Sequence, residues 1–154
     1  MHLRPANGPD FETIASWIPD AAAARRWAGP LLSYPFTAAD LPAALAIPGC
    51  QTSSHCLVDD YIETPLGFGQ YWVFQADAVH LGRIIIAPDA RGRGLGRALC
   101  QHLIEAALAG TQAKAVTLRA YRDNVAAVDL YESLGFAEVE SESTNEVLFM
   151  RKAI

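Results

Sequence analysis

The order of apolar patterns along the chain predicts an α+β domain built on one mixed, mostly antiparallel sheet. Three β-rich segments follow one another with short turns between residues 55 and 87, which favours an antiparallel meander. A single strand–helix–strand crossover comes next, from about residue 84 to residue 118, and it should be right-handed with parallel strands. Two further β-rich segments close the chain. We therefore expect a sheet of about seven strands flanked by about four helices.

The first third of the chain is predicted to supply one strand and two helices. Residues 2–6 form a short strand, and the two helices lie within residues 9–29. The first helix begins at Pro9, because apolar residues recur at helical spacing after it. Prolines interrupt residues 30–50, so this stretch is expected to be rich in loops, with one short helix after Asp40.

The remaining elements follow from the period of the apolar residues and from the turn residues that bound them. Strands are expected at residues 55–60, 66–76, 79–87, 115–121, 136–141 and 146–152, and helices at residues 95–110 and 124–135. In the first of these helices, leucines recur on one stripe until Gly110 ends it.

Length and composition predict one domain spanning residues 1–154. No apolar run approaches the roughly 18 to 20 residues that a membrane span needs, and the N-terminus lacks the apolar core of an export signal. We therefore expect a cytoplasmic protein without a membrane partner. The net charge of −5 argues against a nucleic-acid partner.

The cysteines predict neither a disulfide framework nor a metal site. Cys50, Cys56 and Cys100 are an odd set and contain no C-x-x-C pair. Reduced thiols of this kind fit the expected cytoplasmic location.

The turn between the strand at 79–87 and the helix at 95–110 interleaves arginine with glycine. Its residues are Arg91, Gly92, Arg93, Gly94, Leu95, Gly96 and Arg97. The first N–H groups of a helix have no partner within the helix, and the helix dipole favours an anion there. Glycines let these N–H groups converge on a phosphate without an obstructing Cβ, and arginines add charged donors. The turn is therefore predicted to bind a pyrophosphate.

Two common phosphate-binding motifs do not fit this turn. The dinucleotide fingerprint G-x-G-x-x-G fails because its last glycine would fall on Arg97 or Leu99, and no Gly-Lys-Ser/Thr of a nucleoside triphosphate loop follows. What remains is the pattern R-x-x-G-x-G, formed by Arg91, Gly94 and Gly96.

A second set of residues lies downstream of this turn. Residues 116–136 place Asn124 at the start of a helix, Tyr131 two turns later and Gly135 at its end. Together with R-x-x-G-x-G, this pattern resembles the GNAT superfamily of acyl-CoA-dependent N-acetyltransferases over roughly residues 66–152. The resemblance implies a GNAT-like fold, acetyl-CoA as cosubstrate, no metal, and transfer of the acetyl group to a primary amine by direct attack on the thioester.

The resemblance also implies a role for each matching residue. Gly92 to Arg97 hold the pyrophosphate of coenzyme A through main-chain N–H groups. Asn124 lies near the pantetheine arm, and Tyr131 protonates the departing thiolate. The strand before the turn carries a bulge near Ile86, splays from the next strand, and pairs its backbone with the pantetheine through Ile84, Ile85 and Ile86. An N–H group of the bulge could stabilise the charge that develops on the thioester oxygen.

The general base has three candidates. His80 stands where some family members carry a glutamate or histidine, and its ordinary pKa suits proton transfer at neutral pH. Glu63, on the turn that leads into the pair of long strands, and a chain of water molecules are the alternatives. Ribosomal-protein acetyltransferases of the family use a glutamate where this chain has Arg119. The chain therefore departs from that subfamily.

The acceptor is expected between the first helices and the central strands, with residues 30–50 as its loop. A small-molecule amine is favoured. A protein or peptide amine, at an N-terminus or a lysine, and a non-catalytic acyl-CoA-binding module are the alternatives, and a homodimer is common in the family. Aromatic residues of this region are Trp17, Trp27, Tyr34, Phe36, Phe68, Tyr71 and Trp72.

Overall fold

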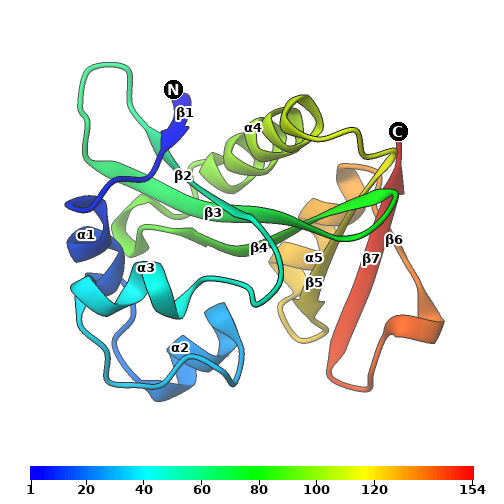
Figure 1. Ribbon diagram of the computed structural model, residues 1–154, viewed down its shortest axis with the longest axis horizontal. Coiled ribbons are helices and arrows are strands. Elements are labelled where there is room, and N and C mark those ends of the chain that lie inside the picture. The colour runs from blue at the N-terminus through cyan, green and yellow to red at the C-terminus, as the bar shows by residue number, and fades with distance from the viewer.

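A computed structural model that describes residues 1–154 contains one seven-stranded mixed sheet with helices on both faces (Figure 1). The strands are β1 (His2–Pro5), β2 (Thr52–Val58), β3 (Pro65–Gln75), β4 (Ala78–Ile86), β5 (Ala115–Tyr121), β6 (Ala137–Glu138) and β7 (Val147–Ala153). The helices are α1 (Asp10–Ser16), α2 (Ala21–Ala28), α3 (Leu41–Ala44), α4 (Leu95–Gly110) and α5 (Val125–Ser133).

The strand order is β1-β2-β3-β4-β5-β7-β6. Every neighbouring pair is antiparallel except β4 and β5, which α4 joins by the predicted parallel crossover. The predicted α+β class and the mixed, mostly antiparallel sheet are confirmed. The fifth helix is α3, the short helix expected after Asp40.

Two element boundaries differ from the sequence-based expectation. β2 begins at Thr52, three residues before the expected residue 55, because Thr52 and Ser53 pair with Trp72 and Tyr71 of β3. Pairing with a long neighbouring strand therefore outweighs the polar character of these residues. The strand expected over residues 136–141 is only the two-residue β6, at the outer edge of the sheet.

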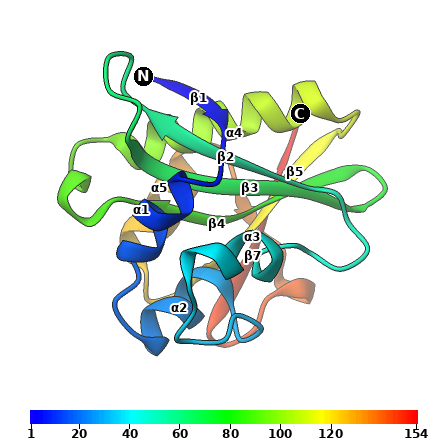
Figure 2. The same cartoon turned by 60° about the vertical axis from the view of Figure 1, so that its left-hand side comes forward.

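The helices cover the two faces of the sheet in two groups, which Figure 2 shows from the side. α4 and α5 lie on one face, and α1, α2 and α3 lie on the other. Alternation along β3 explains this division. Gly69 lies under Leu103 of α4, whereas Phe68 packs edge to face against Phe11 of α1 and Trp27 of α2.

The parallel strands β4 and β5 separate halfway along their length. They pair only from Ala78 to Leu81 on β4, although β4 continues to pair with β3 as far as Ile86. A bulge marks the separation, because both Arg83 and Ile84 stand opposite the single residue Gly69 of β3. Arg83 has a φ of 51°, which is rare for a residue with a side chain. The bulge expected near Ile86 therefore lies earlier, where the ladder to β5 ends.

Candidate active site

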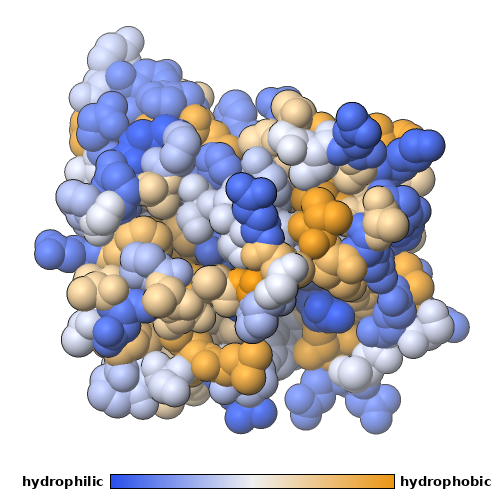
Figure 3. Space-filling view, viewed as in Figure 1, coloured by the Kyte–Doolittle hydropathy of each residue, from blue (hydrophilic) through white to orange (hydrophobic).

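A cleft of about 670 Å³ opens where β4 and β5 separate. Its walls come from α2, the loop after α2, the second halves of β4 and β5, and the start of α5. This volume falls in the range of small-molecule sites. Figure 3 shows the same side of the molecule as Figure 1, with hydrophobic and hydrophilic side chains interspersed over it.

The arginine-rich turn forms a ring of free main-chain donors at the start of α4. None of the N–H groups of residues 92 to 97 donates a hydrogen bond to another part of the protein. Gly92 and Gly94 have φ angles of 75° and 76°, and a Cβ added at either would have no atom within 4 Å. The space beside both glycines is therefore empty, and the free N–H groups of the turn suit a diphosphate group.

The arginines of this turn do not all face outward as free donors. The Nε of Arg91 donates to the main-chain oxygen of Ile86 at 3.2 Å. Arg97 donates from Nη2 to the hydroxyl of Ser133 in α5 at 2.7 Å. These two side chains brace the turn against β4 and α5, whereas Arg93 has no partner within the protein.

The end of β4 offers an unpaired backbone edge to the cleft. Ile84, Ile85 and Ile86 lie beyond the last residue that pairs with β5, so no strand pairs with this edge, although the main-chain oxygen of Ile86 already accepts a hydrogen bond from Arg91. An extended ligand could pair with this edge as an added strand does. Ile84 lines the cleft, and all three isoleucines are partly buried.

Tyr131 and Asn124 project from α5 toward the same cleft. The side chain of Tyr131 is 7% exposed, and burial raises the pKa of its phenol, with a further contribution from nearby Cys100. The hydroxyl therefore keeps its proton at neutral pH and can donate it. Asn124 is the N-cap of α5, and its Oδ1 accepts a hydrogen bond from the N–H of Ala127 at 3.4 Å. Its side-chain NH₂ group remains available to a ligand.

His80 is buried at the base of the cleft. It is 3% exposed, and Nδ1 lies 2.8 Å from the hydroxyl of Thr117. Trp72, Phe74 and Phe149 surround the ring. Burial, followed by the positive charges of Arg119 and Arg83, lowers the pKa of His80 to about 3. The imidazole is therefore neutral near pH 7 but is a weak base.

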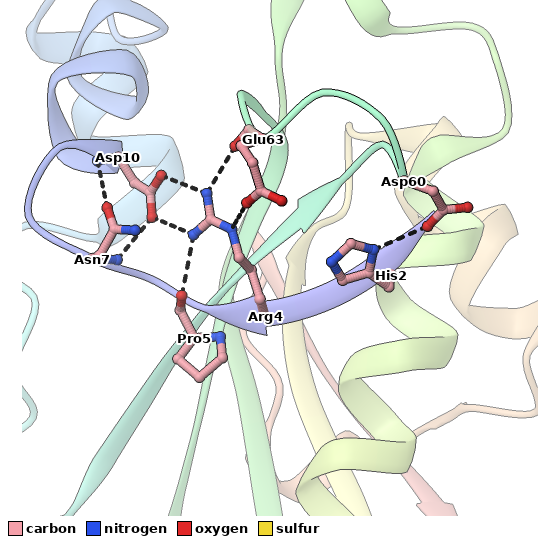
Figure 4. A network of polar contacts seen from close by, with 7 residues as sticks. All are labelled: His2, Arg4, Pro5, Asn7, Asp10, Asp60 and Glu63. Carbon is pink, nitrogen blue, oxygen red and sulfur yellow. Dashed lines mark hydrogen bonds and ion pairs between the residues drawn. The ribbon is translucent and has the colours of Figure 1, made fainter.

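Glu63, the second candidate for the general base, does not line the cleft. Figure 4 shows Glu63 beside Arg4, with its carboxylate 3.1 Å from the Nε of that residue. Arg4 also binds both carboxylate oxygens of Asp10, at 2.7 and 2.9 Å, and the N–H of Asn7 donates to Asp10. This network joins β1, α1 and the β2–β3 turn, and its role is structural.

The structure selects two of the expected aromatic residues for the cleft. Trp27 and Trp72 line it, and Trp17, Tyr34, Phe36, Phe68 and Tyr71 do not. The expected acceptor loop contributes Pro30, Ile47, Pro48 and Cys50. Sequence reasoning missed Arg25, Arg26, Phe74, Arg83 and Tyr121, which also line the cleft. No local motif marks these five, although Phe74 lies on the same face of β3 as Trp72.

The structure contains neither a cluster of potential metal ligands nor a helix that could span a membrane. No group of three or more histidine, cysteine, aspartate or glutamate side chains is placed to hold a metal ion. None of the helices combines the length and the hydrophobicity that crossing a membrane requires.

The chain is similar to a known protein family over most of its length and to curated relatives over part of theirs. A model of the acetyltransferase (GNAT) family matches residues 21–136. The ribosomal protein bS18-alanine N-acetyltransferase of Escherichia coli K12 is 44% identical over 62 residues, which are 40% of this chain and 41% of that protein. The mycothiol acetyltransferase of Renibacterium salmoninarum is 33% identical over 110 residues, which are 68% of this chain and 32% of that protein. The chain thus matches less than half the length of either relative.

Solved structures of acetyltransferases share the fold over nearly the whole chain. An aminoglycoside acetyltransferase in complex with paromomycin and acetyl-CoA superposes with a TM-score of 0.75 at 19% identity, over 99% of this chain and 92% of that one. The spermidine N-acetyltransferase of Vibrio cholerae, in complex with coenzyme A and spermine, gives a TM-score of 0.76 at 21% identity, over 99% and 94% of the two chains.

Proposed function

The chain belongs to the GNAT family of acetyltransferases, and we propose that it transfers the acetyl group of acetyl-CoA to the primary amine of a small molecule. The observation that carries this proposal is the set of free N–H groups at residues 92 to 97, next to an unpaired strand edge. A diphosphate and an extended amide-containing arm are the two parts of coenzyme A that these features fit.

Coenzyme A would lie along the opening between β4 and β5. Its pyrophosphate would accept hydrogen bonds from the N–H groups of residues 92 to 97, with Arg93 as an added charged donor. The pantetheine arm would pair with the backbone of Ile84 to Ile86. The side-chain amide of Asn124 would donate to the same arm. This placement directs the thioester toward His80 and the bulge in β4.

In the transfer step, the neutral amine attacks the thioester carbon, a C–N bond forms and the C–S bond breaks. An N–H group of the bulge at Arg83 and Ile84 stabilises the charge on the thioester oxygen. Tyr131, whose phenol is protonated at neutral pH, donates its proton to the leaving thiolate. Turnover is completed when the phenol recovers a proton from solvent.

The amine must lose a proton, and no other histidine, aspartate or glutamate than His80 lines the cleft. Because the pKa of His80 is lowered to about 3, the imidazole cannot retain this proton near neutral pH. We assign His80 the role of directing the proton to water in the cleft. In this role the imidazole accepts a hydrogen bond from the amine and itself stays neutral.

A protein N-terminus is the second candidate acceptor, because the E. coli relative acts on ribosomal protein bS18. This chain has Arg119 where ribosomal-protein acetyltransferases of this family carry a glutamate. This departure favours a small-molecule acceptor over a protein N-terminus. A module that binds coenzyme A without catalysis is the third candidate.

A thiol-release assay separates these candidates. The purified protein would be mixed with acetyl-CoA and a panel of small amines and of peptides with free N-termini. Thiol release with small amines supports the proposal. Thiol release with peptides alone would instead show that the acceptor is a protein N-terminus. Tight coenzyme A binding without release from any acceptor would leave only the binding module.

A further inference from the structure

The charges of the cleft point to the chemical class of the acceptor. We propose that the acceptor is an amine that also carries an anionic oxygen group, a carboxylate or a phosphate, and that Arg83 and Arg119 bind this group. The inference rests on the proposed function, because it takes the part of the cleft around His80 as the acceptor site, beside the thioester end of the bound coenzyme.

The cleft is positively charged although the protein is acidic. The chain has 17 acidic and 12 basic residues, yet no aspartate or glutamate lines the cleft. The charged residues that line it are Arg25, Arg26, Arg83 and Arg119. Arg26 is neutralised by an ion pair of 2.7 Å with Asp123. The other three arginines have no acidic partner within the protein.

Arg83 is a partly buried cation without a counter-ion, and it gives the main support for an anionic acceptor. Its Nη1 reaches only neutral oxygens, the Oε1 of Gln70 at 3.3 Å and the main-chain oxygen of Leu45 at 3.4 Å. The guanidinium also lies 5.1 Å from the ring of Trp72. Nε and Nη2 make no hydrogen bond within the protein. Buried charges in proteins are normally paired, so the missing partner is expected to come from a ligand.

Arg4 shows what a paired arginine looks like in the same chain. It binds Asp10 through two hydrogen bonds, and these contacts raise its pKa. Burial instead lowers the pKa of Arg83, and no opposite charge counters that effect. An anion bound beside Arg83 would remove this cost.

Arg119 presents a second guanidinium from the other side of the opening. It lies on β5, next to the point where β5 leaves β4, and its guanidinium is 5.0 Å from the ring of Phe149. Arg83 packs on Trp72 and Arg119 packs on Phe149, and the rings of Trp72 and Phe149 both contact the imidazole of His80. Both arginines therefore lie one ring away from His80, and both lower its pKa.

These arginines are separate from the coenzyme's own phosphate site. The segment Ile84 to Ile86, which pairs with the pantetheine in the proposed function, lies between Arg83 and the turn at residues 92 to 97. A polycationic acceptor such as spermidine would meet like charges in this cleft, and that contact is unfavourable. Trp27, Trp72 and Phe74 add apolar walls, which suit an acceptor with an uncharged body.

Matched pairs of acceptors test the proposal. The thiol-release assay would compare L-phenylalanine with L-phenylalaninamide, O-phosphoethanolamine with ethanolamine, and each with spermidine. Amidation removes a neighbouring negative charge and lowers the pKa of the amine, which makes the amide the better nucleophile near neutral pH. A preference for the acid therefore comes from binding.

We expect kcat/KM to be about 10- to 100-fold higher for the anionic member of at least one pair, as a hydrogen-bonded ion pair would give. A preference in the phenylalanine pair identifies a carboxylate as the bound group, and a preference in the ethanolamine pair identifies a phosphate. Equal or better turnover of the member without the anionic group in both pairs, or turnover of spermidine that equals that of the best anionic acceptor, overturns the proposal while leaving the acetyltransferase function intact.

A binding measurement decides the question if no acceptor releases thiol, an outcome that refutes the proposed function itself. The fluorescence of Trp27 and Trp72 would be titrated with the same acceptors in the presence of coenzyme A. Quenching by an anionic acceptor at about tenfold lower concentration than by its partner without the anionic group supports the proposal. Equal quenching, or none by either anion, overturns it.

Substitutions then locate the anion site. Arg119→Gln, at an exposed position, and Arg83→Gln should each lower the preference for the anionic acceptor about 10- to 100-fold. Arg151→Gln is the matched control, because Arg151 lies on the neighbouring strand β7, outside the cleft, and pairs with Asp77 at 3.0 Å. An unchanged preference in both folded cleft variants contradicts the assignment.

Discussion

Replacing Gly94 by alanine should weaken coenzyme A binding much more than it weakens the fold. Gly94 precedes α4 with a φ of 76°, a left-handed conformation that costs a residue with a side chain about 1 to 2 kcal/mol. The added Cβ would have no atom within 4 Å, so no clash adds to this cost. For a domain of this size, the melting temperature should fall by about 2 to 8 °C.

The same methyl group would have a larger effect on the ligand. It would stand where the free N–H groups of residues 92 to 97 converge, and it would displace a phosphate oxygen from at least one of them. A hydrogen bond to a charged group contributes about 1.5 to 3 kcal/mol. Its loss corresponds to an increase of about 10- to 150-fold in Kd. Gly94→Glu adds a negative charge at this point and should abolish binding.

Isothermal titration calorimetry with coenzyme A measures the affinity, and thermal melting measures the fold. Gly49→Ala is the matched control, because Gly49 has a φ of 75°, an equally open Cβ position and no place in the turn. It should lose similar stability and bind coenzyme A as the wild type does. An unchanged Kd in folded Gly94→Ala and Gly94→Glu proteins would refute the pyrophosphate assignment.

Three further substitutions test the catalytic and structural roles of single side chains. Tyr131→Phe should lower kcat about 100-fold with little change in the Kd of coenzyme A, and equal turnover would reduce Tyr131 to a packing role. His80 stays neutral in the folded state down to a pKa of about 3, whereas the unfolded chain binds a proton below about pH 6.5. The free energy of unfolding should therefore fall as the pH drops below 6.5, by up to about 1.4 kcal/mol per pH unit. In urea titrations, His80→Gln should flatten this pH dependence. The same slope in the variant would contradict the conclusion that burial keeps His80 neutral. Asp10→Ala leaves Arg4 without its buried partner and should cost about 3 kcal/mol of unfolding free energy, whereas Asp60→Ala, at an exposed pair, should cost much less in the same urea experiment. Equal losses from the two aspartate variants would count against a structural role for the Arg4 network.

Much of the fold was predictable because local patterns and tertiary structure agree. The apolar stripe of α4, the mostly buried residues of β5 and the crossover between β4 and β5 each have one stable solution in a packed domain. The errors occur where pairing with neighbours decides the outcome. β2 begins early because β3 extends beside it, and β6 is short because it lies at the edge of the sheet.

Part of the candidate site was likewise predictable from local sequence, and part depends on contacts between distant residues. The turn at residues 92 to 97 was predictable, because left-handed glycines and a helix start are properties of a local segment. The environment of His80 was not, because burial by Trp72, Phe74 and Phe149 depends on three different contacts through space. The position of Glu63 was equally hidden, since its partner Arg4 lies 59 residues away in the sequence.

The sequence by itself determined the phosphate-binding turn, the strand before it and the helix after it, because backbone conformation there follows from neighbouring residues. Only the tertiary structure decided which charges share the cleft. Arg83 and Arg119 face one opening because β4 bulges and β5 diverges beside it. The electrostatic field of that opening is a sum over distant segments, and local sequence carries no information about such a sum.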